Sequence, residues 1–500
     1  MFNQKYEAYK GLMQKIKDIE YAVALLHWDM ETYMPAKGAN FRSQQMATLQ
    51  ALAHELFIED STGVLLQELL AEKESLDAEQ LANIQLSLED YEKATKLPIE
   101  FVKESSVIRT EAFQAWLKAR EAKDYEIFSP ALSRMIDNKR EEARLLGYVG
   151  HPYNALLDQY EKGAVVEKLD ILFKVVREKL VIFVKELHEK GKTSPKHFLE
   201  HHFPKAAQWD LGLYLLKQMG YDFEAGRQDI SAHPFTTNFS PEDVRVTTRV
   251  DEKDLMSMIG SCIHEGGHAL YEQGLPTEQY GLPLGSATSL GIHESQSRLW
   301  ENNVALSLAY WKANFSKLQS DFPSQFSGIS TKDYYKAINQ VKPNLIRIEA
   351  DELHYHLHVL IRYELEKGLM DGSISTDNLN KVWNDRYKEY MGVEVADDKE
   401  GVLQDIHWSQ GLVGYFPTYS LGSFYAAQFF NQARKEIPNL ILEIEKGNMK
   451  PMLDWLREKI HRYGRRYTSE ELCEQITGEG LNLKYFMDYA EAKYREIYSI

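Results

Sequence analysis

Apolar residues recur every three or four positions along most of the chain, which is the spacing of one buried face of an amphipathic helix. Near the start, this spacing is followed by Tyr6, Tyr9, Leu12, Met13, Ile16, Ile19, Val23 and Leu26. The same pattern predicts helices over 40–56, 78–96, 126–146, 166–190, 206–219, 300–315, 332–366, 422–436 and 466–497. The sequence therefore predicts a mainly α-helical protein.

One segment departs from this period. Over 244–250, Val244, Val246, Thr248 and Val250 alternate with charged or polar neighbours, which predicts a half-buried strand. A free edge of this strand would suit an extended peptide. Loops rich in Gly and Pro are predicted at 33–38, 191–195, 274–291 and 371–376. Because none is a long linker and no repeat is visible, we expect a single domain over 1–500, built as two helical lobes.

The charge balance narrows the function. With 58 Lys and Arg against 75 Asp and Glu, the net charge is −17, and such a chain repels phosphate backbones and anionic lipid headgroups. We therefore expect neither nucleic-acid nor membrane binding. Two cysteines, Cys262 and Cys473, cannot build a disulfide framework. The first residues lack an export signal, and no apolar run is long enough to span a membrane, so we expect a cytoplasmic protein.

The most informative motif is His264-Glu265-Gly266-Gly267-His268. In a helix, residues four apart share a face, so both imidazoles can reach one metal ion. Glu265 is one step round the helix, where it can take a proton from a water at that ion. The two glycines disfavour helix by about 1 kcal/mol each, but they allow a ligand or a neighbouring backbone to approach closely. The alternative is a solvated pair of histidines with no ion.

A catalytic zinc site needs a third protein ligand and one open position. Glu294, in the helix that follows the 274–291 loop, is the natural choice, with His293 and Glu301 as competitors. His293 points about 100° away from Glu294 around the helix, and Glu301 lies two turns further on. A second metal site at His354, His356 and His358 is a weaker hypothesis, because no Glu follows the first histidine.

Six motifs in order resemble those of the M32 metallocarboxypeptidases, the family of the thermostable Taq and Bacillus type carboxypeptidases. They span 233–408, and the similarity extends over essentially the whole chain. They are His233-Pro234-Phe235 (HPF), Asp243 to Thr247 (DXRXT), His264 to His268 (HEXXH), His293 to Gln296 (HES(G)Q), Ile346 to Asp351 (I/NRXXA/SD) and Gly401 to Trp408 (GXXQDXHW).

This resemblance implies a mostly helical, two-lobed metallopeptidase with a deep groove and a small β element near the HEXXH helix. It implies a zinc carboxypeptidase, with one Zn²⁺ per chain for which Co²⁺ can substitute, that removes single residues from peptides with a free C-terminus, and commonly a homodimer. Carried over by position, His264, His268 and Glu294 are the metal ligands and Glu265 is the catalytic carboxylate.

An exopeptidase also needs a fixed cation for the terminal carboxylate of its substrate, and Arg is preferred for its bidentate fork. Arg347 is the first candidate and Arg245 the second; pairing with Glu349 or Asp243 is the alternative for them. His233, held extended by the proline that follows it, is expected near the end of the groove. Candidate donors to the oxyanion are His407, Tyr415 and Tyr419.

Ligating histidines usually donate their second N–H to an oxygen, and we expect Asp351, Glu352 or Asp405 to accept from His264 and His268. Two other functions stay open. One is a zinc oligopeptidase or dipeptidyl carboxypeptidase, and the other is a catalytically silent helical protein that keeps the metal for stability or for a partner. The presence of Glu265 disfavours the second, because a structural site needs no general base.

Overall fold

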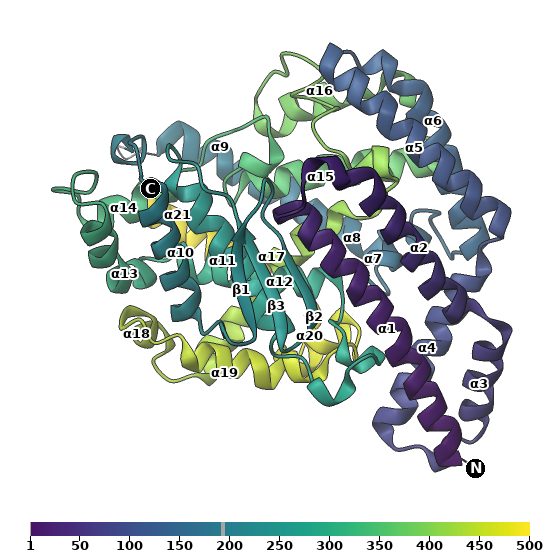
Figure 1. Ribbon diagram of the computed structural model, residues 1–500. Coiled ribbons are helices and arrows are strands. Elements are labelled where there is room, and N and C mark those ends of the chain that lie inside the picture. The colour runs from purple at the N-terminus through teal and green to yellow at the C-terminus, as the bar shows by residue number, and fades with distance from the viewer. Residues whose placement is uncertain (1, 192–195) are drawn as a thin grey trace.

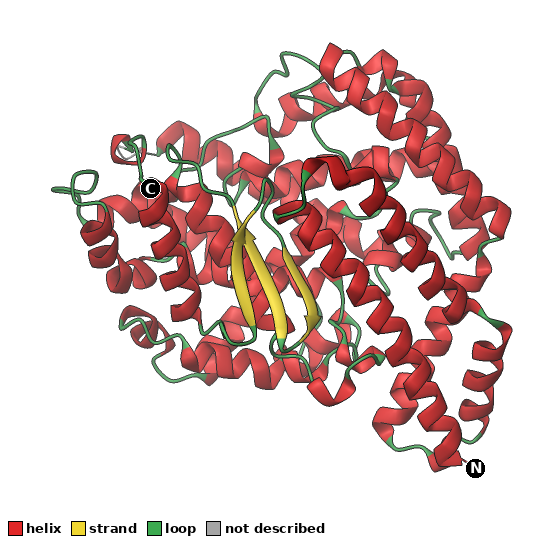
Figure 2. Ribbon diagram, in the orientation of Figure 1, coloured by secondary structure: helices red, strands yellow, loops and turns green. Residues whose placement is uncertain are grey.

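The computed structural model describes residues 2–191 and 196–500, so that the predicted loop at 191–195 lies outside the described residues except for Gly191. The described chain is mainly helical with one small sheet, as the sequence predicts (Figure 2). None of the described helices is long and apolar enough to cross a bilayer.

The α-helices are α1 (Phe2–Thr32), α2 (Ala39–Ile58), α3 (Asp60–Ala71), α4 (Ala78–Lys96), α5 (Ile99–Ala122), α6 (Ser129–Leu146), α7 (Asn154–Tyr160), α8 (Val166–Val175), α9 (Val181–Lys190), α10 (Lys205–Met219), α11 (Leu255–Glu272), α12 (Leu290–Arg298), α13 (Leu308–Asp321), α14 (Thr331–Ile338), α15 (His354–Asp371), α16 (Leu379–Met391), α17 (Phe416–Glu436), α18 (Leu440–Glu445), α19 (Lys450–Lys459), α20 (Ser469–Thr477) and α21 (Lys484–Tyr498). Two π-helical segments are η4 (Val176–Leu180) and η8 (Leu299–Ala305). The 3-10 turns are η1 (Ala36–Gly38), η2 (Lys73–Ser75), η3 (Tyr125–Ile127), η5 (His197–Leu199), η6 (Thr277–Gln279), η7 (Pro283–Gly285), η9 (Arg347–Glu349), η10 (Thr376–Asn378), η11 (His407–Gln410) and η12 (His461–Tyr463).

Helix boundaries follow local chemistry. The helix predicted at 78–96 has these bounds in α4, and Asp77 and Gln80 form a capping box that fixes its start. The single helices predicted at 332–366 and 466–497 are each interrupted in the structure. The first is divided into α14 and α15, and Pro343, which cannot continue a helix, lies in the segment between them. Gly478, at φ +83°, ends α20 in the left-handed conformation.

The sheet has three strands, β1 (Gly226–Ile230), β2 (Thr236–Ser240) and β3 (Asp243–Thr248), in the order β1-β3-β2. β3 is the predicted strand, with Val244 and Val246 buried, and it pairs parallel to β1 and antiparallel to β2. The expectation of a free edge on this strand is wrong, because a partner lies on each side of it. The outer strands of the sheet are β1 and β2.

The sheet packs against α11, the helix that carries the first histidine motif. In Figure 1 its strands lie in front of this helix, and α1 runs diagonally beside β2. Helices α1 to α6 gather on one side of α11, and α13, α14, α18 and α21 on the other. The N-terminus and the C-terminus lie at opposite ends of the molecule.

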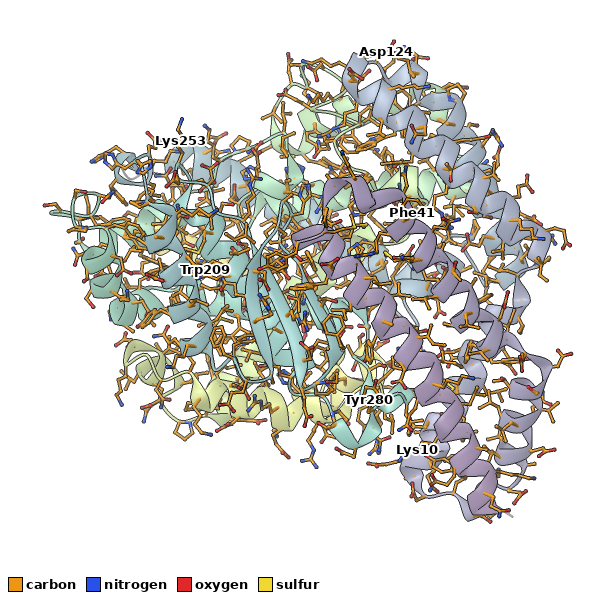
Figure 3. The ribbon with its side chains drawn as sticks, viewed as in Figure 1. Lys10, Phe41, Asp124, Trp209, Lys253 and Tyr280 are labelled. Carbon is orange, nitrogen blue, oxygen red and sulfur yellow. The ribbon has the colours of Figure 1, made fainter. Side chains whose placement is uncertain are left out.

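One continuous cluster of buried apolar residues extends from Ile108 to Tyr498 and surrounds α11, α12, α15 and α17. A smaller cluster joins α1, α3 and α4 to Leu282 in the loop that follows α11. In the same loop, the Tyr280 hydroxyl donates to Asp18 of α1 at 2.7 Å (Figure 3). The N-terminal helices are thus joined to the loop that connects the two motif-bearing helices.

Candidate metal centre

The first two candidate ligands lie on α11. The Asp254 side chain accepts the Ser257 backbone N–H at 3.0 Å and so fixes the start of this helix. His264 and His268 follow one turn apart on one face, with ring centroids separated by 4.9 Å and planes at 85°. The predicted helical placement of the pair is therefore confirmed.

Glu294 reaches the same point from α12, which begins where the Ser289 hydroxyl accepts the Ile292 N–H at 3.0 Å. The close approach of the helices depends on glycines. A Cβ at Gly267 would lie 2.6 Å from Ser297 Cα, and one at Gly422 of α17 would lie 2.5 Å from Glu294 Cγ. The expectation that a glycine of the motif admits a neighbouring backbone is confirmed at Gly267.

The three side chains converge closely enough to hold a metal ion. His264, His268 and Glu294 each offer a ligand atom within 4.8 Å of the others. Glu294 Oε2 lies 3.7 Å from His264 Nε2 and 3.5 Å from His268 Nε2. Ligand atoms about 2.0–2.1 Å from a tetrahedral zinc ion are separated by about 3.4 Å, so the spacing fits a small divalent cation. The donor set, two imidazoles and a carboxylate, is also that of catalytic zinc sites.

His264 is oriented by a carboxylate that the sequence placed among the competing ligands. Its Nδ1 lies 2.7 Å from Glu301 Oε2, which leaves Nε2 to face Glu294. Arg298 joins the two carboxylates, donating to Glu294 Oε1 at 2.7 Å and to Glu301 Oε2 at 3.0 Å. Glu301 lies at the start of η8, whose π-helical turn follows directly on α12.

His268 is oriented by the second competing residue. Its Nδ1 lies 2.5 Å from His293 Nδ1, and His293 Nε2 lies 2.7 Å from Glu272 Oε1. Asn238 of β2 donates to the other oxygen of Glu272 at 2.6 Å. If His268 presents Nε2 to a cation, its Nδ1–H donates to His293, which in turn donates to Glu272.

The prediction that His264 and His268 donate to Asp351, Glu352 or Asp405 is wrong. Each is engaged elsewhere because it faces a different part of the core. Asp351 binds His354 at 2.6 Å, Glu352 binds Lys493 at 2.7 Å, and Asp405 binds two arginines.

The charges of this centre act on one another at close range. Burial disfavours the protonated form of His264, but Glu294 and Glu301 outweigh it and raise its pKa to about 9. Burial and the neighbouring His293 lower the pKa of His268 to about 3. Burial opposes ionisation of Glu294, yet Arg298 and His264 hold its pKa well below its usual range. A cation that binds here competes with a proton on His264.

Glu265 lies beside the ligands and faces the sheet. Only 8% of its surface is exposed, and its Oε2 accepts the Thr236 hydroxyl of β2 at 2.7 Å. Burial raises the pKa of this carboxyl above its ordinary value, and His264 acts in the opposite direction. A carboxylate with a raised pKa is suited to take up a proton and release it again.

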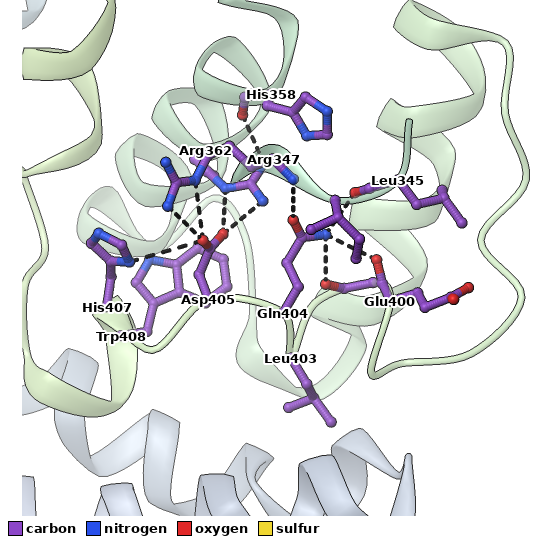
Figure 4. A network of polar contacts seen from close by, with 12 residues as sticks. Leu345, Arg347, His358, Arg362, Glu400, Leu403, Gln404, Asp405, His407 and Trp408 are labelled. Carbon is purple, nitrogen blue, oxygen red and sulfur yellow. Dashed lines mark hydrogen bonds and ion pairs between the residues drawn. The ribbon is translucent and has the colours of Figure 1, made fainter. Parts of the chain in front are cut away.

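The arginine of the fifth motif, Arg347, is buried and paired. Its Nε and Nη2 donate to Asp405 Oδ1 at 3.1 and 3.0 Å (Figure 4). Its Nη1 donates to the Tyr355 hydroxyl at 3.1 Å. The predicted alternative partner Glu349 instead accepts from Asn344 at 3.2 Å. Tyr355 also lies under Arg298, 4.4 Å from ring to guanidinium, so it connects Arg347 to the metal centre.

Arg245 and His233 lie on the sheet side. Arg245 of β3 makes two hydrogen bonds to Asp243, the alternative that the sequence left open, and its guanidinium lies 4.5 Å from the Trp28 ring of α1. His233 is exposed in the turn between β1 and β2. The Ser231 hydroxyl donates to its backbone carbonyl at 2.6 Å, which fixes this turn.

The three candidate oxyanion donors form one aromatic cluster. His407 Nε2 lies 3.2 Å from the Tyr419 hydroxyl, and the Tyr415 and Tyr419 rings are 5.2 Å apart. The Arg347 guanidinium lies 4.9 Å from the Tyr419 ring. Burial and the nearby Glu294 raise the pKa of Tyr415, so its hydroxyl stays protonated as a donor.

The hypothesis of a second metal site is not supported. His354, His356 and His358 are buried, but each binds a different partner: Asp351, Ser420 and Tyr387. Within residues 2–191 and 196–500, no other group of His, Cys, Asp and Glu is close enough to hold an ion.

Sequence reasoning missed four residues with a clear place in this region: Thr236, Glu272, Arg298 and Arg362. The spacing contained a signal for two of them. Arg298 is four positions after Glu294, and Glu272 is four after His268, so each shares a helix face with a candidate ligand. Thr236 and Arg362 come from elements distant in sequence.

A cavity of about 970 Å³ adjoins the metal centre. Arg298, Glu301 and Tyr355 line it on the side of the centre. Lys253, which precedes α11 and is labelled in Figure 3, and Ile348, which is 75% exposed, also line it. This cavity gives the surroundings of the centre access to solvent.

An H-E-x-x-H helix under a small sheet, with a carboxylate supplied by the next helix, defines a helical metallopeptidase. Comparison with known proteins then places the chain more narrowly. The family model described as Carboxypeptidase Taq (M32) metallopeptidase matches residues 8–494. The chain belongs to this family and is a metallocarboxypeptidase, and peptides are its substrates.

Individual relatives align with this chain over nearly their whole length. Thermostable carboxypeptidase 1 of Thermus thermophilus is 39% identical, with 98% of this chain and 99% of the relative covered. The solved M32 carboxypeptidase of Deinococcus radiodurans R1 is 36% identical with a TM-score of 0.97, covering 99% of this chain and 100% of the other. A structure described as CHT is 58% identical with a TM-score of 0.97, covering 98% and 99%.

Proposed function

We propose that this chain is a zinc carboxypeptidase that removes one residue at a time from the C-terminus of peptides, with Glu265 as its general base. The observation that carries the proposal is the convergence of His264, His268 and Glu294 beside the carboxylate of Glu265. These three side chains would hold a zinc ion and would leave room for a water or a substrate atom, as in catalytic sites. A bound zinc ion supplies a Lewis acid and lowers the pKa of a coordinated water.

The side chains divide the remaining work. Glu265, held by Thr236, accepts the proton of the attacking water and returns it to the leaving amine. Tyr415 and Tyr419 supply hydroxyl donors near the developing oxyanion. Arg347 binds the terminal carboxylate of the peptide, which selects the last residue for removal. Arg245, already paired to Asp243, and His233 line the approach on the sheet side.

Replacement of Glu265 tests the mechanism. The variant E265Q should lose at least about a hundredfold in kcat, because a general base typically contributes 10²–10⁴-fold. Hydrolysis of a short free-acid peptide and the metal content are measured together. E278Q, which removes an exposed carboxylate after the same helix, serves as control. A native rate in E265Q at unchanged metal content contradicts the mechanism and favours a silent metal-binding protein.

The choice between exopeptidase and oligopeptidase needs a second substrate pair. A peptide with a free C-terminus should be cleaved much faster than the same peptide with an amidated end, and mass spectrometry should show loss of single residues. Equal cleavage of both, or release of dipeptides, contradicts carboxylate recognition by Arg347 and favours the oligopeptidase or dipeptidyl carboxypeptidase.

A further inference from the structure

Two buried arginines share one carboxylate beside the metal centre (Figure 4). Asp405 Oδ1 accepts from Arg347, and Asp405 Oδ2 accepts from Arg362 Nε at 2.7 Å and lies 2.6 Å from Arg362 Nη2. Arg362 is fully buried on α15, where its Nη1 also donates to the His358 carbonyl at 2.9 Å. Its guanidinium lies 4.4 Å from the Trp383 ring. Each guanidinium thus occupies one oxygen of Asp405.

The charges of this cluster do not balance. Within the described part of the chain, Asp405 is the only carboxylate at ion-pair distance from Arg347 or Arg362. Burial lowers the pKa of His407 to about 4 and that of His358 well below its ordinary value, so both are neutral. Two positive charges and one negative charge leave a net charge of +1 in a buried place.

Arg347 also has hydrogen-bond capacity to spare. A guanidinium has five N–H groups. Asp405 takes two of those of Arg347, and the Tyr355 hydroxyl takes one. Among the described residues, no partner takes the remaining N–H on each of its two terminal nitrogens. Two such donors on one guanidinium match the two oxygens of a carboxylate.

We propose that Arg362 is a positioning residue for substrate recognition: it neutralises Asp405 from behind, so that Arg347 stays fixed yet keeps an uncompensated charge for the C-terminal carboxylate of the peptide. The proposal rests on the proposed carboxypeptidase function. Without Arg362, Asp405 and Arg347 form a neutral pair, and the carboxylate of the substrate competes with Asp405 for the same cation. A buried pair that is already neutral gains little from a second anion.

Loss of the Arg362 charge should weaken binding of peptides with a free C-terminus. R362M keeps much of the side-chain volume but removes the charge, and it should raise KM for a free-acid peptide at least about tenfold, with a smaller change in kcat. The slow cleavage of the amidated peptide should not change. R362K keeps the charge and should lie near the native enzyme. R465M is a suitable control, because it breaks the half-buried Arg465–Asp90 pair, which is separate from the Arg347–Asp405–Arg362 cluster, and should leave KM unchanged.

The double variant R362M/D405N separates charge from packing. It removes one positive and one negative charge, which restores the net charge of +1, so its KM should return towards the native value. If R362M does not fold, the double variant carries the test. A native KM in folded R362M, or a KM at least tenfold raised in R362M/D405N, overturns the proposal. Failure of the carboxypeptidase function itself appears separately, as equal cleavage of free-acid and amidated peptides by the native enzyme.

Discussion

At the scale of single residues, the orientation of the candidate ligands depends on side chains that are not themselves candidate ligands. His264 and His268 each turn one nitrogen to Glu294 and the other to a fixed partner, Glu301 or His293. Such partners fix the ring orientation and the tautomer of each histidine, so the two side chains lose less conformational freedom when a cation binds. Glu301 also shares Arg298 with Glu294, so its contact with His264 links α11 to the ligand-bearing helix α12.

Loss of the Glu301 charge should weaken metal binding. We expect E301Q to bind zinc about 10–100-fold more weakly, because the imidazole of His264 loses a charged acceptor. Titration of metal-free protein against a competing chelator measures the affinity. E458Q, an exposed change on α19, is the control. Equal zinc affinity in E301Q and the native protein would contradict the role given to Glu301.

At the scale of elements, glycines decide how closely α11, α12 and α17 pack. Gly267 and Gly422 face the neighbouring helix with no room for a side chain, whereas Gly260 on α11 has no atom within 4 Å of an added Cβ. Glycine costs helix stability wherever it stands, so its use at Gly267 follows from the contact with α12 and not from propensity.

Two of the three glycines of α11, Gly260 and Gly267, should respond in opposite directions to alanine. G267A places a Cβ 2.7 Å from the Gln296 carbonyl oxygen, so α12 must shift, and we expect a loss of about 1–3 kcal/mol in unfolding free energy together with weaker metal binding. G260A should instead gain roughly 0.5–1 kcal/mol. Denaturant unfolding and metal titration of both variants check this. Destabilisation by G260A comparable to that by G267A would refute the packing argument.

Elements with their signals close in sequence were predictable, and those that depend on distant contacts were not. The start of α4 follows from its capping box, and the pairing of His264 with His268 follows from helix geometry. The break between α14 and α15 was missed although Pro343 signals it, because the apolar spacing continues across it. Arg362 and Asp405 are 43 positions apart, and the spacing of apolar residues does not predict a contact over such a distance.

At the scale of the whole molecule, Glu366 joins segments far apart in the chain. On α15, it accepts hydrogen bonds from the Tyr153 hydroxyl, from Trp408 Nε1 at 2.7 Å and from the Gly414 N–H at 2.9 Å. Burial raises its pKa to about 7, against the hydrogen bonds that favour the ionised form. The folded protein therefore keeps a proton on this carboxyl at a pH where the unfolded chain has lost it.

This difference makes stability depend on pH. Between about pH 4.5 and about pH 7, unfolding releases the proton of Glu366. The free energy of unfolding therefore falls by up to about 3 kcal/mol through this group as the pH rises over this range. E366Q does not titrate, so the difference in unfolding free energy between native protein and variant should shift in favour of the variant over this range. Denaturant titrations at pH 5 and pH 7.5 measure it. If the unfolding free energies of both proteins changed equally between pH 5 and pH 7.5, the raised pKa of Glu366 would be contradicted.

The tight contact of Gly422 with Glu294 also concerns how the enzyme is made. All three candidate ligands have been synthesised once residue 294 is added, but the helix that packs against Glu294 begins only at Phe416. A growing chain thus contains the complete ligand set for more than a hundred residues before it contains the surface that holds it. We expect hydrolytic activity to arise late in synthesis, so that an unfinished chain emerging beside other nascent peptides does not digest them; chains truncated before Phe416 should accordingly be inactive.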